Sequence, residues 1–99
     1  MNKHIILLFI ILCIGLTKAS AQHSITGKVL DATNQEPIPF ASVTIKNVKS
    51  GTTTDNNGNF TLKVNNNDIL IVSFMGYETK EVNIGTQKKV TILLSESSV

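Results

Sequence analysis

The sequence predicts an all-β domain, a sandwich of two sheets built from about seven short strands. Apolar and polar residues alternate along short stretches that Asn, Gly, Asp or Pro interrupt every ~8–12 residues, which is typical of strands joined by turns. No long stretch carries apolar residues at helical spacing. Strands this short must close on one another to bury one face, and we expect them to pair antiparallel throughout.

The first 21 of the 99 residues have the features of an export signal. Lys3 supplies a positive charge, residues 5–16 are apolar, and Ala19 and Ala21 form the small-x-small pattern that signal peptidase accepts. The apolar run is shorter than the ~20 residues that a membrane-spanning helix needs. We therefore predict a helical signal peptide over residues 1–21 and a mature domain over residues 22–99 that does not span a membrane.

Removal of this leader changes the charge of the protein. The nine basic residues are all lysines, and two of them lie in the leader, so seven lysines remain to balance seven carboxylates. A neutral domain without arginine is a poor candidate for binding nucleic acid. The single cysteine, Cys13, also lies in the leader, so the mature domain contains no disulfide and depends on a well-filled core.

The first strand is predicted over residues 25–29, with alternate side chains facing the core. A polar turn over residues 31–36 and two prolines lead into the second strand, residues 41–45. A short threonine-rich strand follows over residues 52–54.

A tight turn is predicted over residues 56–59, because Asn57-Gly58 supplies the two positive φ angles that a two-residue hairpin requires. The next strand covers residues 60–64. Residues 69–74 are apolar on both faces, which places that strand inside a sheet rather than at its edge.

Gly76 ends that run, and two further strands are predicted over residues 82–84 and 90–94. Among the aromatic residues, Phe40, Phe60 and Phe74 fit core positions. Tyr77 fits two interpretations: an exposed platform on which a sugar ring could stack, or a corner anchored by its hydroxyl, and the corner is favoured.

No arrangement of residues in the mature chain points to catalysis or to a cofactor. The one histidine, His23, lies next to the predicted new N-terminus, where residues are usually loosely held. Residues 55–59 look like the start of a calcium loop, but the glycine is in the wrong place and the later ligands are missing, so no metal site is expected. The carboxylates are expected in turns or on solvent-exposed faces.

The order of the motifs resembles a known family, the carboxypeptidase-regulatory-like domains. The resemblance covers about residues 24–94 and rests on Ile25-x-Gly27-x-Val29, Asp31, Pro37-Ile38-Pro39-Phe40-Ala41, Gly51-Thr52-x-Thr54-Asp55-x-x-Gly58-x-Phe60 and Asp68-x-Leu70-x-Val72-Ser73-Phe74-x-Gly76-Tyr77. It implies a seven-stranded antiparallel, transthyretin-like (prealbumin-like) Greek-key sandwich without catalytic activity.

Domains with this signature and a signal peptide commonly form the N-terminal extension of SusC-type TonB-dependent receptors, which import glycans and other nutrients across the outer membrane of Gram-negative bacteria. The resemblance therefore implies an exported interaction domain in the periplasm or at the outer membrane, with an envelope protein or the TonB-dependent uptake machinery as partner. Weak carbohydrate binding at Tyr77 is the alternative. A free-standing domain and the front of a truncated receptor both fit the sequence.

Overall fold

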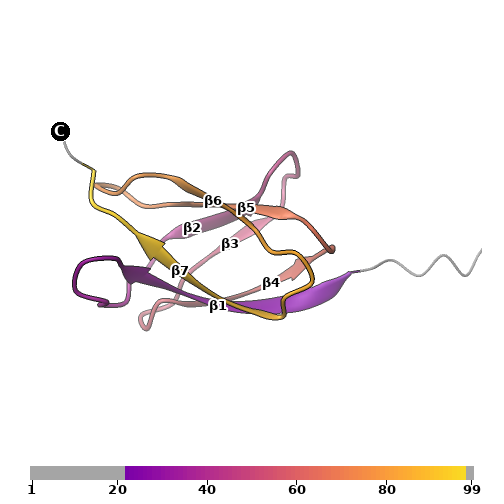
Figure 1. Cartoon of the computed structure of the whole chain (residues 1–99), viewed down its shortest axis with the longest axis horizontal. Coiled ribbons are helices and arrows are strands. Elements are labelled where there is room, and N and C mark those ends of the chain that lie inside the picture. Colours follow the sequence, from indigo (N-terminus) through magenta and orange to yellow (C-terminus); the bar gives the residue numbers. More distant parts are fainter. Residues whose placement is uncertain (1–21, 98–99) are drawn as a thin grey trace, which may run out of the picture.

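The computed structural model describes residues 22–97, which form two β-sheets packed face to face (Figure 1). The strands are β1 (His23–Asp31), β2 (Ser42–Ile45), β3 (Gly51–Thr53), β4 (Asn59–Val64), β5 (Ile69–Ser73), β6 (Lys80–Asn83) and β7 (Lys89–Leu94). One sheet has the order β4-β1-β7 and the other β3-β2-β5-β6. The predicted seven-stranded all-β sandwich is confirmed, whereas the predicted signal peptide lies outside the described residues.

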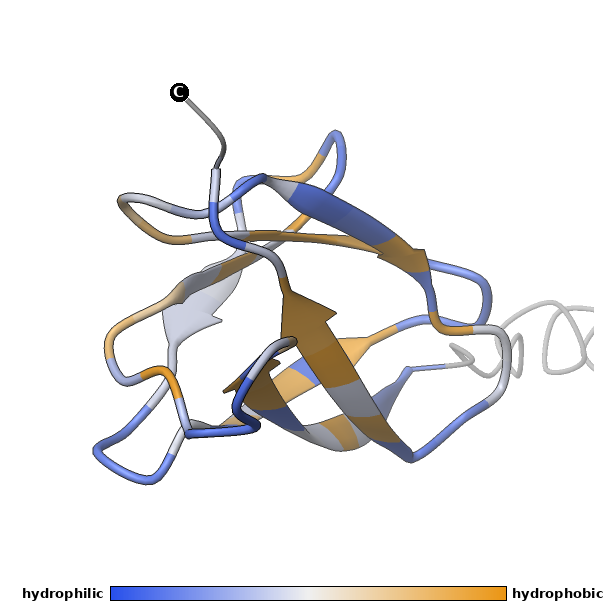
Figure 2. Cartoon of the chain, turned by 60° about the vertical axis from the view of Figure 1, so that its left-hand side comes forward, coloured by the Kyte–Doolittle hydropathy of each residue, from blue (hydrophilic) through white to orange (hydrophobic). Residues whose placement is uncertain are grey.

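The core lies between the sheets and follows the predicted alternation. In β4, Phe60, Leu62 and Val64 are buried, while the residues between them are exposed. β5 lies between β2 and β6, so its predicted place inside a sheet is confirmed. Figure 2 shows apolar residues along strands of both sheets and hydrophilic residues in many of the loops.

One strand pair differs from the predicted antiparallel arrangement. β1 and β7 run parallel, with Gly27 opposite Val90 and Val29 opposite Ile92. These are the first and last strands of the sandwich. Because the chain passes through both sheets between them, no short turn forces them to run in opposite directions.

The two-residue hairpin predicted over residues 56–59 is wrong. The turn connects β3 and β4, which belong to different sheets, and the positive φ angle lies at Gly58 (76°) and not at Asn57. The Asp55 carboxylate accepts hydrogen bonds from the backbone N–H groups of Asn57 and Asn59, both at 2.9 Å. These bonds, with that from the Gly58 N–H to the Asp55 carbonyl, stabilise a three-residue turn instead.

Candidate functional site

Three connecting segments and the residues that follow β7 meet at the end of the sandwich where β1, β5 and β7 finish, on the left of Figure 1. Backbone hydrogen bonds tie them together: Ala32 N–H to the Leu94 carbonyl at 2.8 Å, Phe40 N–H to the Thr54 carbonyl at 3.0 Å, and Glu78 N–H to the Ser95 carbonyl at 2.8 Å. We call this surface the loop end. It comprises residues 32–41, 54–58, 74–79 and 95–97.

A buried carboxylate anchors one side of the loop end. Asp31, the last residue of β1, is only 4% exposed, and it accepts hydrogen bonds from the Tyr77 hydroxyl at 2.6 Å and the Thr33 N–H at 2.7 Å. The Tyr77 ring also contacts Phe74, with the ring centroids 6.0 Å apart. Tyr77, next to Gly76 (φ 88°), thus ties the β5–β6 connection to the end of β1.

The bond between the two side chains shifts both pKa values. The hydrogen bonds from Tyr77 and Thr33 lower the pKa of Asp31, and the bond to Asp31 raises the pKa of Tyr77 to about 12. The sequence predicted Asp31 in a polar turn over residues 31–36, and its burial was not foreseen. One local sign of the bonded carboxylate was available in the sequence. An Asp at the start of a turn often accepts hydrogen bonds from the N–H groups two or three residues later, as Asp31 does from Thr33 and Asn34.

Replacing Tyr77 by Phe should therefore change how stability depends on pH. A lowered carboxyl pKa stabilises the fold above the unfolded pKa of ~4, and a raised tyrosine pKa does so below the unfolded pKa of ~10. Thermal unfolding followed by circular dichroism should show Tyr77→Phe less stable than the natural protein near pH 7. The difference should shrink below pH ~4 and again between pH ~10 and 12; a difference that stays constant across this range would contradict the assignment.

A second buried polar group shapes the opposite side of the loop end. Thr54 is 2% exposed; its hydroxyl donates to the Ile38 carbonyl at 2.6 Å and accepts the Ala41 N–H at 2.8 Å. The threonine hydroxyl thereby bridges the two ends of the Pro39-Phe40 turn. It fixes this turn with Phe40 at a φ angle of 62°.

Phe40 is not a core residue, contrary to the sequence prediction. It is 66% exposed, because the left-handed backbone that follows Pro39 directs its side chain outward. Phe60 is buried as predicted, and Phe74 is partly buried against the core. Met75 is 92% exposed. Ser42 and Ser73 are paired between the neighbouring strands β2 and β5. Phe40 lies two residues before Ser42, and Met75 lies two residues after Ser73, so both belong to the loop end.

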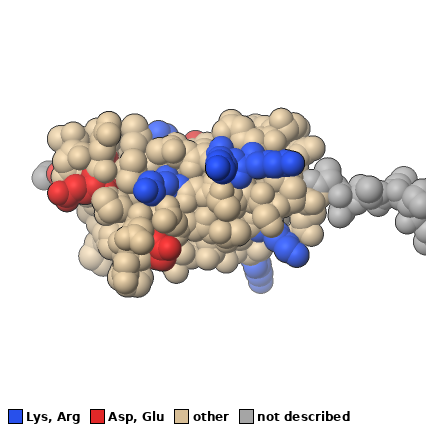
Figure 3. Space-filling model, turned by 90° about the horizontal axis from the view of Figure 1, so that it is seen from below, with Lys and Arg blue, Asp and Glu red and all other residues tan. Residues whose placement is uncertain are grey.

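Charge is unevenly distributed along the sandwich. Four of the seven carboxylates lie at the loop end, namely Glu36, Asp55, Glu78 and Glu96, and Asp31 lies directly beside it; its four segments contain no lysine. Five lysines lie in or within two residues of the turns at the other end, namely Lys46, Lys49, Lys63, Lys88 and Lys89. Figure 3 shows acidic side chains gathered toward the loop end of the face that it presents. The neutral domain is therefore electrically polarised.

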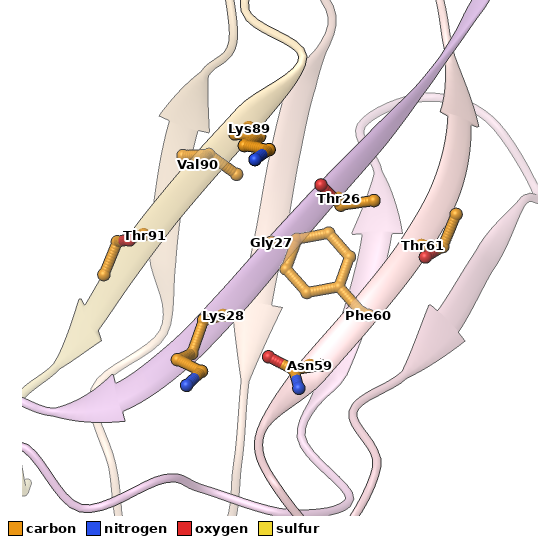
Figure 4. A pocket seen from close by; sticks show the side chains of 9 residues that line it. All are labelled: Thr26, Gly27, Lys28, Asn59, Phe60, Thr61, Lys89, Val90 and Thr91. Carbon is orange, nitrogen blue, oxygen red and sulfur yellow. The ribbon is translucent and has the colours of Figure 1, made fainter.

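A shallow groove of about 480 Å³ crosses β4, β1 and β7 (Figure 4). Its lining residues are Thr26, Gly27, Lys28, Asn59, Phe60, Thr61, Lys89, Val90 and Thr91. Every polar side chain in this lining is exposed to solvent. The groove is a depression in the sheet surface, without a buried polar group directed into it.

His23 is the first residue of β1, opposite Val64, rather than part of a loose tail, and its Nε2 lies 3.1 Å from the Gln87 carbonyl oxygen. Among residues 22–97, no three His, Cys, Asp or Glu side chains lie close enough to hold a metal ion. Over the same residues, no helix is long and apolar enough to cross a membrane.

Comparison with known families identifies the domain. The model of the CarboxypepD_reg-like domain family matches residues 25–99. The chain belongs to this family. Two curated relatives of this CarboxypepD_reg-like domain are TonB-dependent receptor SusC of Bacteroides thetaiotaomicron, 34% identical over 92 residues, and TonB-dependent receptor P3 of Formosa agariphila, 28% identical over 93 residues. Each match covers 93% of this chain but only 9% of the relative.

Solved structures share the fold of this CarboxypepD_reg-like domain. A Bacteroides fragilis protein described as a putative membrane-associated protein of unknown function superposes with a TM-score of 0.58 and 24% identity, covering 82% of this chain and 30% of that one. The cohesin–X-dockerin complex of Acetivibrio cellulolyticus contains a chain with the same TM-score and 21% identity, covering 72% and 56%. At these identities the likeness concerns the sandwich fold alone.

Proposed function

We propose that this chain is an exported, non-catalytic interaction domain that docks onto another cell-envelope protein in TonB-dependent nutrient uptake. The observation that carries the proposal is the match of 93% of this chain to receptors of that class. Because the match spans about a tenth of each receptor, the chain corresponds to one module of them. Transport across the membrane therefore belongs to other parts of such a receptor.

The proposed location is the periplasm or the outer membrane of a Gram-negative bacterium. The predicted signal peptide over residues 1–21 supports export. The loop end supports docking, because it exposes Phe40 and Met75 on a framework held by the buried Asp31 and Thr54. A binding surface on a rigid framework loses little conformational entropy when a partner binds.

A chimaeric receptor tests this function. In TonB-dependent receptor SusC, residues 25–97 of this chain would replace the matching stretch, and uptake would be compared with that of the intact receptor and of a receptor lacking the stretch. We expect the chimaera to restore most of the uptake that the deletion removes. A chimaera that reaches the outer membrane in normal amounts but takes up no more than the deletion variant would refute the proposal.

The alternative of weak carbohydrate binding at Tyr77 stays a prediction. The Tyr77 hydroxyl is bonded to Asp31, and the aromatic ring next to it is that of Phe74, which packs against the core. Calorimetry against a panel of oligosaccharides, with Tyr77→Ala as control, decides this alternative.

A further inference from the structure

We infer that the loop end is the docking surface itself, and that it receives a protein segment carrying lysine or arginine next to aliphatic residues. Phe40 and Met75 would supply the apolar contacts, and the surrounding carboxylates the charge. The inference rests on the proposed function, because it names the surface and the partner chemistry of the same interaction.

Phe40 is poorly explained by folding alone. A positive φ angle is unfavourable for an L-residue with a bulky side chain, and Phe40 follows Pro39 at the turn position where glycine is usual. Burial of the Phe40 side chain offsets little of this strain, because two thirds of the side chain is exposed to water. A glycine would fit this backbone with less strain, so the aromatic ring is better explained by a contact outside the domain.

Met75 is a second exposed apolar side chain at the loop end. Its side chain is almost fully exposed, and it follows the end of β5 by two residues, as Phe40 precedes the start of the paired strand β2 by two. Aromatic side chains dominate the energetics of many protein interfaces, and methionine adapts its shape to varied partners. Together they could hold an aliphatic side chain.

The charges around this pair determine the kind of partner. Glu36, Asp55, Glu78 and Glu96 are all exposed, and the loop-end segments contain no lysine; Lys80, directly after Thr79, lies beside Glu78 and leaves the surface acidic overall. Such a surface attracts cationic groups and repels acidic ones, mainly through the rate of association and the choice of partner. The partner segment should therefore be basic.

Two synthetic peptides test the inference: one of alternating lysine and leucine, and one of alternating glutamate and leucine. Each would be titrated into the isotope-labelled exported chain and followed by amide resonances. We expect the lysine peptide to shift resonances of the loop end, with an affinity that falls steeply as salt is raised from ~50 to ~300 mM. Phe40→Gly should weaken its binding about tenfold.

Val48→Gly is the matched control, since Val48 is also exposed but lies in the β2–β3 turn at the other end. It should leave the affinity unchanged. Phe40→Gly removes backbone strain, so its thermal midpoint should not fall, and weaker binding cannot then reflect unfolding. Equal binding of both peptides, or shifts confined to the lysine-rich end, would overturn the inference.

Two further outcomes separate this inference from the proposed function. If the natural chain self-associates and Phe40→Gly abolishes the association, the occupant is a second copy and a basic partner is rejected. If the SusC chimaera restores uptake and its Phe40→Gly variant does so equally, the loop-end inference fails while the proposed function stands. Failure of the chimaera together with selective, Phe40-dependent peptide binding would refute the function but support the surface.

Discussion

Gly27→Ala should destabilise the domain by about 3 kcal/mol, although it adds a single methyl group. Gly27 lies in β1, the middle strand of its sheet, opposite Phe60 on one side and Val90 on the other. A Cβ atom built there would overlap the ring of Phe60, which lies across β1 at this position (Figure 4). The ring is 4% exposed, so it can move only by disturbing the core. Urea unfolding at equilibrium measures the loss.

Thr26→Ala, at the exposed neighbouring position, is the control and should cost less than 1 kcal/mol. A double variant tests the mechanism, because Phe60→Leu removes the ring that the new methyl group meets. Gly27→Ala combined with Phe60→Leu should be more stable than the sum of the two single losses predicts. Strict additivity would show that the cost of Gly27→Ala does not arise at Phe60.

Alternation within strands was the most dependable signal in the sequence, because a half-buried strand must present every second side chain to the core. It located all seven strands, and in β4 it identified the inward-facing residues Phe60, Leu62 and Val64, which are buried. Alternation is a local property, however. It does not say which strands become neighbours.

Pairing between distant strands required the three-dimensional structure. The parallel partnership of β1 and β7 joins residues more than 60 positions apart, for example Gly27 and Val90. The assignment of β3 and β4 to different sheets likewise depends on how the whole chain closes. The turn between them misled sequence reasoning because Asn57-Gly58 matched a hairpin pattern, while the carboxylate of Asp55 selected another turn.

The candidate site was the part least visible in the sequence. Phe40 follows a proline and precedes an alternating strand, so its apolar side chain suggested the core. Its exposure depends on a positive φ angle, which is held by the hydroxyl of Thr54, 14 positions further along the chain. The burial of Asp31 similarly depends on Tyr77, which reaches it from another sheet connection.

Thr54→Val should cost about 2 kcal/mol of stability and also loosen the turn that presents Phe40. Valine keeps the shape of threonine but cannot bond to the Ile38 carbonyl or the Ala41 N–H. At a site that is 2% exposed, water cannot readily replace the lost hydroxyl. Urea unfolding measures the stability, and amide hydrogen exchange at Ala41 reports the local effect, which should be faster exchange.

Thr54→Ser separates the hydroxyl from the methyl group. Serine retains both hydrogen bonds and loses only packing, so it should be more stable than the valine variant and keep slow exchange at Ala41. Equal losses in the two variants would assign the role of Thr54 to packing. If the hydroxyl is responsible, the valine variant should also bind the lysine–leucine peptide more weakly than the serine variant. Phe40 then has to be ordered again on binding, and that ordering costs conformational entropy.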